Sequence, residues 1–371
     1  MRSNIREIGS FFETEDSYKN WFYDYTSEQI SFTTWINSVG DKKAFYFESG
    51  RAALSAVIQE IEERGINKIC LLPEYLCDTV IKPFTKRNWN VVYYHLNSDL
   101  SPDEGELRHL VQKHTPGVIL TVLYYGRDTI SDIRGYLKEL RKGGVITIED
   151  LTQSLFMFER SNDDDISNYR LASIRKWLPV SGGGIAFLKN EPRYEYSASE
   201  YISKQHEAQI LKLKYLSGEV VDKDEFLFLH REAESILDNR YGCHPMDLDS
   251  YGILGVYDIA SVKRRRYLNT RVLEKGIHNL KRIRALISYK ENDDVPLYYP
   301  VIADDRDALQ EYMRARNVFL PVLWPVPKEL GGDISCKIKN IYDNMLAIPC
   351  DQRYEEEDMI LIINMLHEYE E

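Results

Sequence analysis

RLASIRKWLPVSGGGIAF, residues 170–187, is the stretch that decides the fold and the site. In it Lys176 stands between a short apolar run of β-strand character and three consecutive glycines. Most of the 47 lysines and arginines must be solvated surface charges, so a lysine taken alone means little. A lysine that forms a Schiff base must be partly desolvated, and flanking glycines let a cofactor and the backbone approach it closely. The flanks of Lys176 fit both needs.

Upstream of this stretch, short apolar runs alternate with amphipathic segments. Continuous apolar strands separated by such helices indicate an α/β fold with a largely parallel sheet that is covered on both faces. We expect strands at 44–47, 68–73, 90–96, 118–125 and 145–150, directly before Lys176, and at 184–188. We expect helices at 51–64, 77–86, 102–113 and 130–142.

The remainder of the chain predicts a second, smaller unit. Residues 190–293 contain long, charged segments that favour helices. We expect these segments to cross to a second domain or to form part of a dimer contact. The tail predicts a small α/β unit with strands at 296–303, 318–324 and 345–350 and helices at 305–317 and 355–369. We expect an N-terminal arm (1–43), a large cofactor-binding domain (44–245), and a linking helix with the small C-terminal domain (246–371).

Length, net charge and the number and spacing of cysteines limit the class of protein to which this chain can belong. A chain of 371 residues favours two domains. The net charge of −12 argues against a nucleic-acid partner. The five cysteines lack metal-ligand spacing, so we expect reduced thiols and no metal site. No stretch approaches the roughly 20 apolar residues of a membrane span, and we expect a soluble cytoplasmic protein.

Asp150 closes the run VITIED at the carboxyl end of a predicted parallel strand, where open α/β sheets place ligand-binding residues. A helix N-cap for the following LTQSLF explains this aspartate equally well. In the functional interpretation, the Asp150 carboxylate pairs with a protonated heteroaromatic nitrogen. A pyridinium needs such a partner to act as an electron sink.

Ser49, Gly50 and Arg51 follow a strand and open a helix, and helix N-termini with glycine bind phosphate through backbone N–H groups. The chain has neither GxxxxGK[ST] nor GxGxxG. A phosphate turn, an acidic strand end and a lysine before glycines, in this order, are explained by one cofactor, pyridoxal 5'-phosphate. The run Arg264-Arg265-Arg266 could meet a diphosphate, but such a run is more often a solvated helix face.

Five motifs carry a resemblance that spans residues 44–368. They are GRAAL at 50–54, LP at 72–73, EDLTQ at 149–153, Lys176 with GG at 183–184, and AIP at 347–349 followed by ED at 357–358. In this order they resemble the DegT/DnrJ/EryC1/StrS sugar aminotransferases, which are fold-type I pyridoxal-phosphate enzymes.

The resemblance implies a role for each motif residue. Lys176 would carry the cofactor and move the proton at the substrate-side carbon. Asp150 would pair with the pyridine nitrogen, and Gln153 would lie near the 3'-hydroxyl. The backbone N–H groups of Gly50 and Arg51 would hold the phosphate.

Three positions depart from the family pattern. Leu171 stands where the family has a phosphate-binding serine, so Ser173 is the alternative. Cys77 stands where the family has the aromatic residue that stacks on the cofactor, which leaves Tyr75 as the candidate. The loop that reaches the partner's site has only a scrambled counterpart, NRYG at 239–242.

The resemblance implies a mainly parallel seven-stranded sheet, a small C-terminal α/β domain and a homodimer with sites at the subunit interface. It also implies transamination, in which an amino acid, expected to be glutamate, supplies the amino group for a keto group on a nucleotide-linked sugar. Three alternatives stay open: a pyridoxal-phosphate lyase or dehydratase, a non-catalytic binding protein of the same fold, and a doubly wound nucleotide-binding protein.

Overall fold

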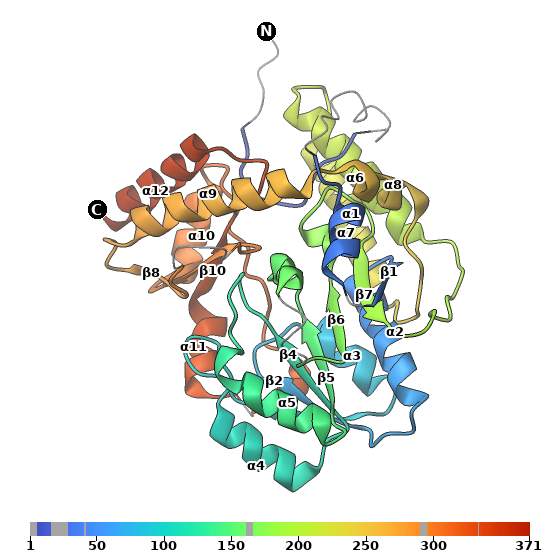
Figure 1. The fold of residues 1–371 in the computed structure, drawn as a ribbon. Helices are drawn as coiled ribbons and strands as arrows, with labels where there is room; N and C mark the ends of the chain where they lie inside the picture. Colours follow the sequence, from blue (N-terminus) through green and yellow to red (C-terminus); the bar gives the residue numbers. More distant parts are fainter. Residues whose placement is uncertain (1–5, 16–28, 41, 161–165, 290–294, 333) are drawn as a thin grey trace.

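A seven-stranded sheet forms the larger part of the fold (Figure 1). The computed structural model describes residues 6–15, 29–40, 42–160, 166–289, 295–332 and 334–371. The strands are β1 (Lys43–Phe47), β2 (Ile69–Pro73), β3 (Asn90–Tyr94), β4 (Val118–Val122), β5 (Ile146–Asp150), β6 (Tyr169–Ala172) and β7 (Gly184–Leu188). Their order is β1-β7-β6-β5-β4-β2-β3. The pairs from β3 to β6 are parallel, and β7 is antiparallel to both β6 and β1, which confirms the mainly parallel sheet.

Helices cover both faces of this sheet. Every residue of β4 and β5 is buried although successive side chains point to opposite faces, so neither face is open to solvent. Of the covering helices, α2 packs on β6 and β7, and α5 packs on β5. The four helices predicted between the strands are confirmed as α2 (Gly50–Glu62), α3 (Asp78–Thr85), α4 (Glu104–His114) and α5 (Arg134–Lys142).

The pairing of the strands brings three chain segments to one edge of the sheet. Because β1 and β6 are both antiparallel to β7, they run in the same direction. Helix α2, which follows β1, therefore begins at the edge where β5 and β6 end. Ser49 caps α2, since its side chain accepts the N–H of Ala52 at 3.1 Å.

Within the ranges that the structure describes, four helices and four short 3-10 turns complete the part around the large sheet. The hairpin of α6 and α7 packs tightly on itself, and α1 packs against α8. Helix α1 was not predicted, although Phe32, Trp35 and Ile36 on it are buried. The helices are α1 (Phe32–Val39), α6 (Glu200–Leu216), α7 (Lys223–Leu237) and α8 (Leu248–Val256), and the turns are η2 (Ser131–Ile133), η3 (Leu155–Glu159), η5 (Ile174–Lys176) and η6 (Lys328–Leu330).

The small unit is a three-stranded antiparallel sheet in the order β10-β9-β8, which confirms the predicted C-terminal α/β unit. Helix α9 runs toward it from the large unit and packs along α12 (Figure 1). Strand β8 and helix α11 were not predicted. The elements are α9 (Ile259–Ile277), β8 (Ile283–Ala285), β9 (Tyr299–Ala303), α10 (Arg306–Arg314), α11 (Cys336–Asn344), β10 (Met345–Ile348) and α12 (Glu356–Glu370).

The strand predicted at 318–324 is wrong. Only Val318 pairs there, through an isolated parallel bridge to Ile8. Pro321 has no N–H to donate to a ladder, although its carbonyl accepts the N–H of Ala347 at 3.1 Å. No helix in the described residues is both long and apolar enough to cross a membrane. The division into arm, large domain and small domain stays a prediction.

Candidate active site

Lys176 ends the short turn η5, between the end of β6 and the start of β7. No described residue forms a hydrogen bond or an ion pair with its amine. Burial lowers the pKa of Lys176 below its usual value, and the neighbouring Arg175 guanidinium lowers it further, whereas Asp150 opposes the shift. A lysine amine that is desolvated and free of partners is available as a nucleophile and as a base.

The glycines after Lys176 let two backbone segments meet. A Cβ on Gly184 would overlap the carbonyl oxygen of Ser49, and one on Gly183 would come within 2.9 Å of Arg175 N. The carbonyl of Gly183 accepts the N–H of Ile174 at 2.9 Å. The glycine run therefore fixes the turn that carries Lys176 against the start of α2.

Asp150 is almost fully buried at the end of β5, with 6% of its surface exposed. Its Oδ1 accepts the N–H of Thr152 at 2.8 Å, and Oδ2 has no hydrogen-bond partner within the described part of the chain. Burial raises the pKa of this carboxyl, and the bond from Thr152 and the charge of Lys176 offset part of the rise. Asp150 is therefore not the N-cap of a helix, since η3 begins only at Leu155 with Ser154 at its N-cap position. It stabilises a local turn and also offers a free oxygen.

The start of α2 lies against Ser173. A Cβ on Gly50 would come within 2.8 Å of Ser173 Cβ, so only glycine allows this approach. The Ser173 N–H donates to Thr152 Oγ1 at 3.0 Å. The guanidinium of Arg51 turns away to the end of α7, where it donates to the Leu237 carbonyl and pairs with Asp238. Arg51 can therefore face a phosphate through its backbone N–H and not through its side chain.

A first cavity of about 380 Å³ gathers most of the predicted residues. Gln153 is one of them, and its Oε1 accepts the Tyr125 N–H at 3.4 Å. The predicted residues that line the cavity are Gly50, Arg51, Asp150, Gln153, Ser173 and Lys176.

Tyr75 is the predicted residue that does not line the first cavity. It is buried behind the wall, where its ring lies 4.9 Å from those of Trp324 and Tyr342 and its hydroxyl lies 3.0 Å from that of Tyr125. Trp324 lines the cavity in its place, together with Cys77. A cofactor ring in this cavity would contact Trp324 or Cys77 before Tyr75.

Sequence reasoning also missed Glu234 on α7. Its carboxylate forms two bonds with Arg175, at 2.8 and 3.0 Å. Glu234 lies 59 residues from Arg175 in the chain, and nothing local to its helix marks it as a site residue. The ion pair borders Lys176 and fixes the end of α7 over the first cavity.

A second cavity of about 500 Å³ opens on the other side of Lys176. Arg175, Lys176 and Glu234 line both cavities. Its walls come from η5, the α6–α7 hairpin, the small unit and the N-terminal segment at Ser10, Phe11 and Phe12. A group bound in the first cavity and a molecule bound in the second would therefore meet at Lys176.

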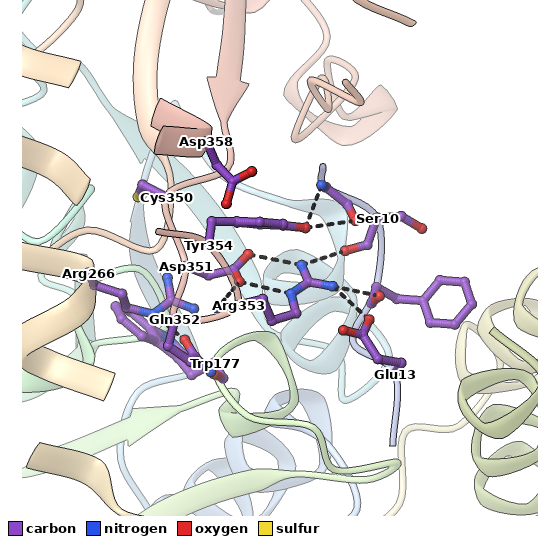
Figure 2. A network of polar contacts seen from close by, with 12 residues as sticks. Ser10, Glu13, Trp177, Arg266, Cys350, Asp351, Gln352, Arg353, Tyr354 and Asp358 are labelled. Atoms are coloured by element: carbon purple, nitrogen blue, oxygen red, sulfur yellow. Dashed lines mark hydrogen bonds and ion pairs between the residues drawn. The ribbon is translucent and has the colours of Figure 1, made fainter. Parts of the chain in front are cut away.

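The N-terminal segment is held in this wall by Arg353 (Figure 2). Arg353 donates to both carboxylate oxygens of Asp351, at 2.8 and 2.9 Å, and to Glu13 Oε2 at 3.1 Å. It also donates to the carbonyls of Ser10 and Phe11, each at 3.1 Å. The ring of Phe11 stacks on His230 of α7, with 4.1 Å between the ring centres. Among the described residues, no group of three or more His, Cys, Asp or Glu side chains is placed to hold a metal ion.

This chain is similar to solved structures of other proteins. No protein-family model matches the chain, and no curated protein sequence matches it. Helicobacter pylori PseC, an aminotransferase involved in the biosynthesis of pseudoaminic acid, aligns over 98% of this chain and 99% of its own with a TM-score of 0.69 and 13% identity. The sugar aminotransferase CalS13 from Micromonospora echinospora aligns over 99% and 100%, with a TM-score of 0.64 and 13% identity.

A third solved structure is Spr1654 from Streptococcus pneumoniae in its PLP-form, which aligns over 98% of both chains with a TM-score of 0.66 and 16% identity. The alignments cover nearly the whole chain and include both sheets. The chain therefore has the fold-type I fold of these aminotransferases, as the five motifs predicted.

Proposed function

We propose that this protein is a pyridoxal-phosphate-dependent aminotransferase that acts on a sugar. The observation that carries the proposal is the first cavity, where the partner-free amine of Lys176, the free Oδ2 of Asp150 and the start of α2 face one space. The fold shared with PseC and CalS13 supports it. The finer proposal is that an amino acid, expected to be glutamate, is the donor and that the acceptor is a keto group on a nucleotide-linked sugar.

The residues fit the cofactor in three respects. The free oxygen of Asp150 can pair with a pyridinium nitrogen, and ionising this buried carboxyl becomes favourable once a cation lies beside it. Gly50 and Arg51 at the helix start can hold a phosphate through backbone N–H groups, helped by the helix dipole. Lys176 can be attached through its amine, because burial lowers the pKa of this amine and so favours its neutral form.

Pyridoxal phosphate, when bound, supplies an electron sink that stabilises negative charge at the carbon next to the substrate nitrogen. With its amine free, Lys176 Nζ would take the proton from that carbon and return one later. Asp150 would keep the cofactor nitrogen protonated, and Gln153 and Ser173 would orient the ring and the phosphate. Donor and acceptor would enter through the second cavity, which reaches the same amine.

We also propose a homodimer in the cytoplasm. The five cysteines are free, as a reducing compartment maintains them. Three large apolar side chains on neighbouring parts of the large unit are exposed, Tyr196 by 81%, Leu248 by 85% and Tyr251 by 46%. Burial of these side chains against a second copy removes them from water. Sedimentation of a single 43.4 kDa species at micromolar concentration would contradict the dimer.

The absorption spectrum of the purified, cofactor-loaded protein tests the function. Addition of glutamate is expected to replace the band of lysine-bound cofactor with that of its amine form and to release 2-oxoglutarate. Lys176→Ala should lose the lysine-bound band, whereas Lys189→Ala, an exposed lysine after β7, should keep it. A borohydride-reducible link to the cofactor in Lys176→Ala would reject the lysine assignment.

The same assay distinguishes two other functions from an aminotransferase. A pyridoxal-phosphate lyase or dehydratase keeps the lysine-bound band but yields no 2-oxoglutarate from glutamate. A non-catalytic binding protein of this fold takes up no cofactor or does not convert it. The unpaired Lys176 beside Asp150 favours the enzyme, because an uncompensated buried carboxyl and amine are costly to keep without a use.

A further inference from the structure

The helical hairpin of α6 and α7 forms a wall of both cavities. Gln205 and Gln209 on α6 and His230 on α7 line the second cavity, and Leu237 at the end of α7 lines the first. Glu234 lines both. A molecule bound in either cavity therefore lies against the hairpin.

The hairpin has an apolar core of its own. Its two helices pack chiefly on each other, and Tyr201, Ala233 and Leu237 form a buried cluster between them. The main apolar core includes no side chain of residues 200–237, all of which the structure describes. Burial of apolar surface supplies most of the free energy that holds packed elements together. The hairpin is therefore attached to the rest of the molecule more weakly than the strands of the large sheet are.

Polar bonds join the hairpin to the chain on either side of η5 and before β7. The Tyr201 hydroxyl donates to the Ser181 carbonyl, and the Ser181 hydroxyl donates to Gln209 Oε1, both at 2.8 Å. Arg175 binds Glu234 through two bonds, at 2.8 and 3.0 Å. Water can replace each of these partners, so such bonds contribute little net free energy compared with apolar burial. They fix the closed position but can break together at modest cost.

The N-terminal segment ties the hairpin to the small unit. The ring of Phe11 stacks on His230 of α7. Glu13 Oε2 accepts hydrogen bonds from Lys212 of α6 and from Arg353 of the small unit, both at 3.1 Å, and Figure 2 shows the bond from Arg353. The position of the hairpin is therefore linked to that of the small unit.

We propose that the hairpin of α6 and α7 is a lid over both cavities, which opens as one unit and which a bound ligand holds closed. The two helices move together because their shared cluster lies between them. A ligand contacts Glu234 and the other lining side chains only while the lid is closed, so binding shifts the equilibrium toward that state. The proposal concerns access to the site and holds for any ligand of the two cavities, whatever reaction follows.

Hydrogen exchange of the cofactor-free, full-length protein measures the opening. Amides of α6 and α7 are expected to exchange on the order of a hundredfold faster than those of β4 and β5, after correction for intrinsic rates. With pyridoxal phosphate at about ten times its Kd, exchange of the hairpin should slow roughly tenfold, because the open lid lacks the ligand contacts. Hairpin amides that are as protected as those of β4 and β5, or that bound cofactor does not slow, overturn the proposal.

Tyr201→Phe removes one bond between the lid and the large unit and keeps the cluster within the lid. Exchange of α6 and α7 should become roughly threefold to tenfold faster. Tyr94→Phe is the matched control, because the buried Tyr94 hydroxyl also donates to a backbone carbonyl, that of Leu120 at 3.1 Å, but within the large sheet. It should leave exchange of the hairpin unchanged. Equal exchange of the hairpin in Tyr201→Phe and Tyr94→Phe overturns the proposal.

The rate of cofactor entry tests whether the hairpin controls access. Tyr201 lines neither cavity, so its replacement leaves the contacts of a bound ligand intact. At low pyridoxal phosphate concentration, the second-order rate constant for attachment should rise in Tyr201→Phe by the same factor as the exchange rate, since both scale with the population of the open lid. An unchanged rate constant beside faster exchange would show that the hairpin opens without controlling access, and would reject its role as a lid.

The failure of this proposal and that of the proposed function are distinguishable. A protein that takes up no pyridoxal phosphate rejects the proposed function alone. The comparison of hairpin and sheet amides, together with the effect of Tyr201→Phe on exchange, still decides whether the hairpin opens as one unit.

Discussion

Arg175 and Glu234 form a two-bond ion pair, at 2.8 and 3.0 Å, immediately beside Lys176. The two partners act on the lysine in opposite directions. Burial is the main cause that lowers the pKa of Lys176 and Arg175 adds to it, whereas the Glu234 carboxylate raises that pKa. The pair therefore tunes how much of the amine is neutral at a given pH.

Glu234→Gln should shift this balance. With the carboxylate charge lost, the pKa of Lys176 falls further below its usual value, and the neutral amine appears at lower pH. The rate at which the cofactor attaches, measured by absorbance as a function of pH, should reach its half-maximum at lower pH than in wild type. Glu232→Gln removes a half-exposed carboxylate of the same helix, which pairs with Lys204, and should leave this midpoint in place. A midpoint at higher pH in Glu234→Gln contradicts the prediction.

Asp150→Asn should separate function from stability. Burial raises the pKa of Asp150 above its unfolded value, so its stabilising effect is present at low pH and is lost as pH rises through the folded pKa. At neutral pH the buried charge therefore costs stability in the cofactor-free protein. Asparagine can still accept the Thr152 N–H, so we expect an equal or higher Tm at pH 7. Cofactor conversion should fall on the order of a hundredfold or more, because the pyridinium loses its charge partner.

Asp351→Asn should have the opposite effect on stability to Asp150→Asn. The charge and hydrogen bonds of Arg353 outweigh burial and lower the pKa of Asp351. Its contribution is therefore present above the unfolded pKa and is lost as pH falls through the folded one. The cofactor-free Asp351→Asn protein should have a lower Tm at pH 7. The pKa of Asp150 is raised and that of Asp351 is lowered, so the two variants should differ in Tm. A fall in Tm of similar size in Asp150→Asn would contradict this difference.

Gly184→Ala should disrupt the contact between the glycine run and the start of α2. The new methyl group would overlap the Ser49 carbonyl, a backbone atom that cannot rotate away. We expect a loss of about 1–3 kcal/mol in the free energy of unfolding, measured by urea denaturation, and weaker cofactor retention. Gly255→Ala in α8 meets no atom within 4 Å and should leave stability unchanged or raise it by about 0.5–1 kcal/mol.

Arg353→Met should release the N-terminal segment from the wall of the second cavity. It leaves the Asp351 charge buried and unpaired, which costs about 3–5 kcal/mol. Hydrogen exchange at residues 8–13 should become faster than in wild type. Arg316→Met, an exposed arginine that covers the ring of Tyr312, serves as the control and should change neither quantity much. Unchanged exchange in Arg353→Met would show that other contacts hold the segment.

Local patterns predicted the large sheet well, because most of its strands are mainly apolar runs bounded by turns. The pattern at 318–324 was equally apolar, yet Pro321 interrupts its hydrogen bonding and the strand does not form. Helix α1 went unseen because eight residues give barely two turns of periodicity. Its apolar face becomes visible only once α8 packs against it.

In the site, Lys176, Asp150 and Gly50 could be predicted because each sits at a fixed place relative to a strand or helix end. Glu234 and Trp324 could not, since they reach the first cavity from distant parts of the chain. The charge run that includes Arg266 was interpreted as a solvated face, and the structure corrects this for Arg266, which is buried. Arg266 lies on the buried stripe of α9 with Val262 and Leu273, but its charge hides this position from an apolar pattern.

The N-terminal segment, residues 8–13, contacts residues close to the C-terminal end of the chain. The N–H of Ile8 donates to the Asn317 carbonyl at 2.9 Å, and the Gly9 N–H donates to the Tyr354 hydroxyl at 2.6 Å. During synthesis, residues 8–13 leave the ribosome well before the small unit, and their partners Asn317, Arg353 and Tyr354 emerge only after more than three hundred further residues. The large sheet can form before this segment binds its partners in the small unit. The wall of the second cavity is therefore completed in one of the last steps of folding.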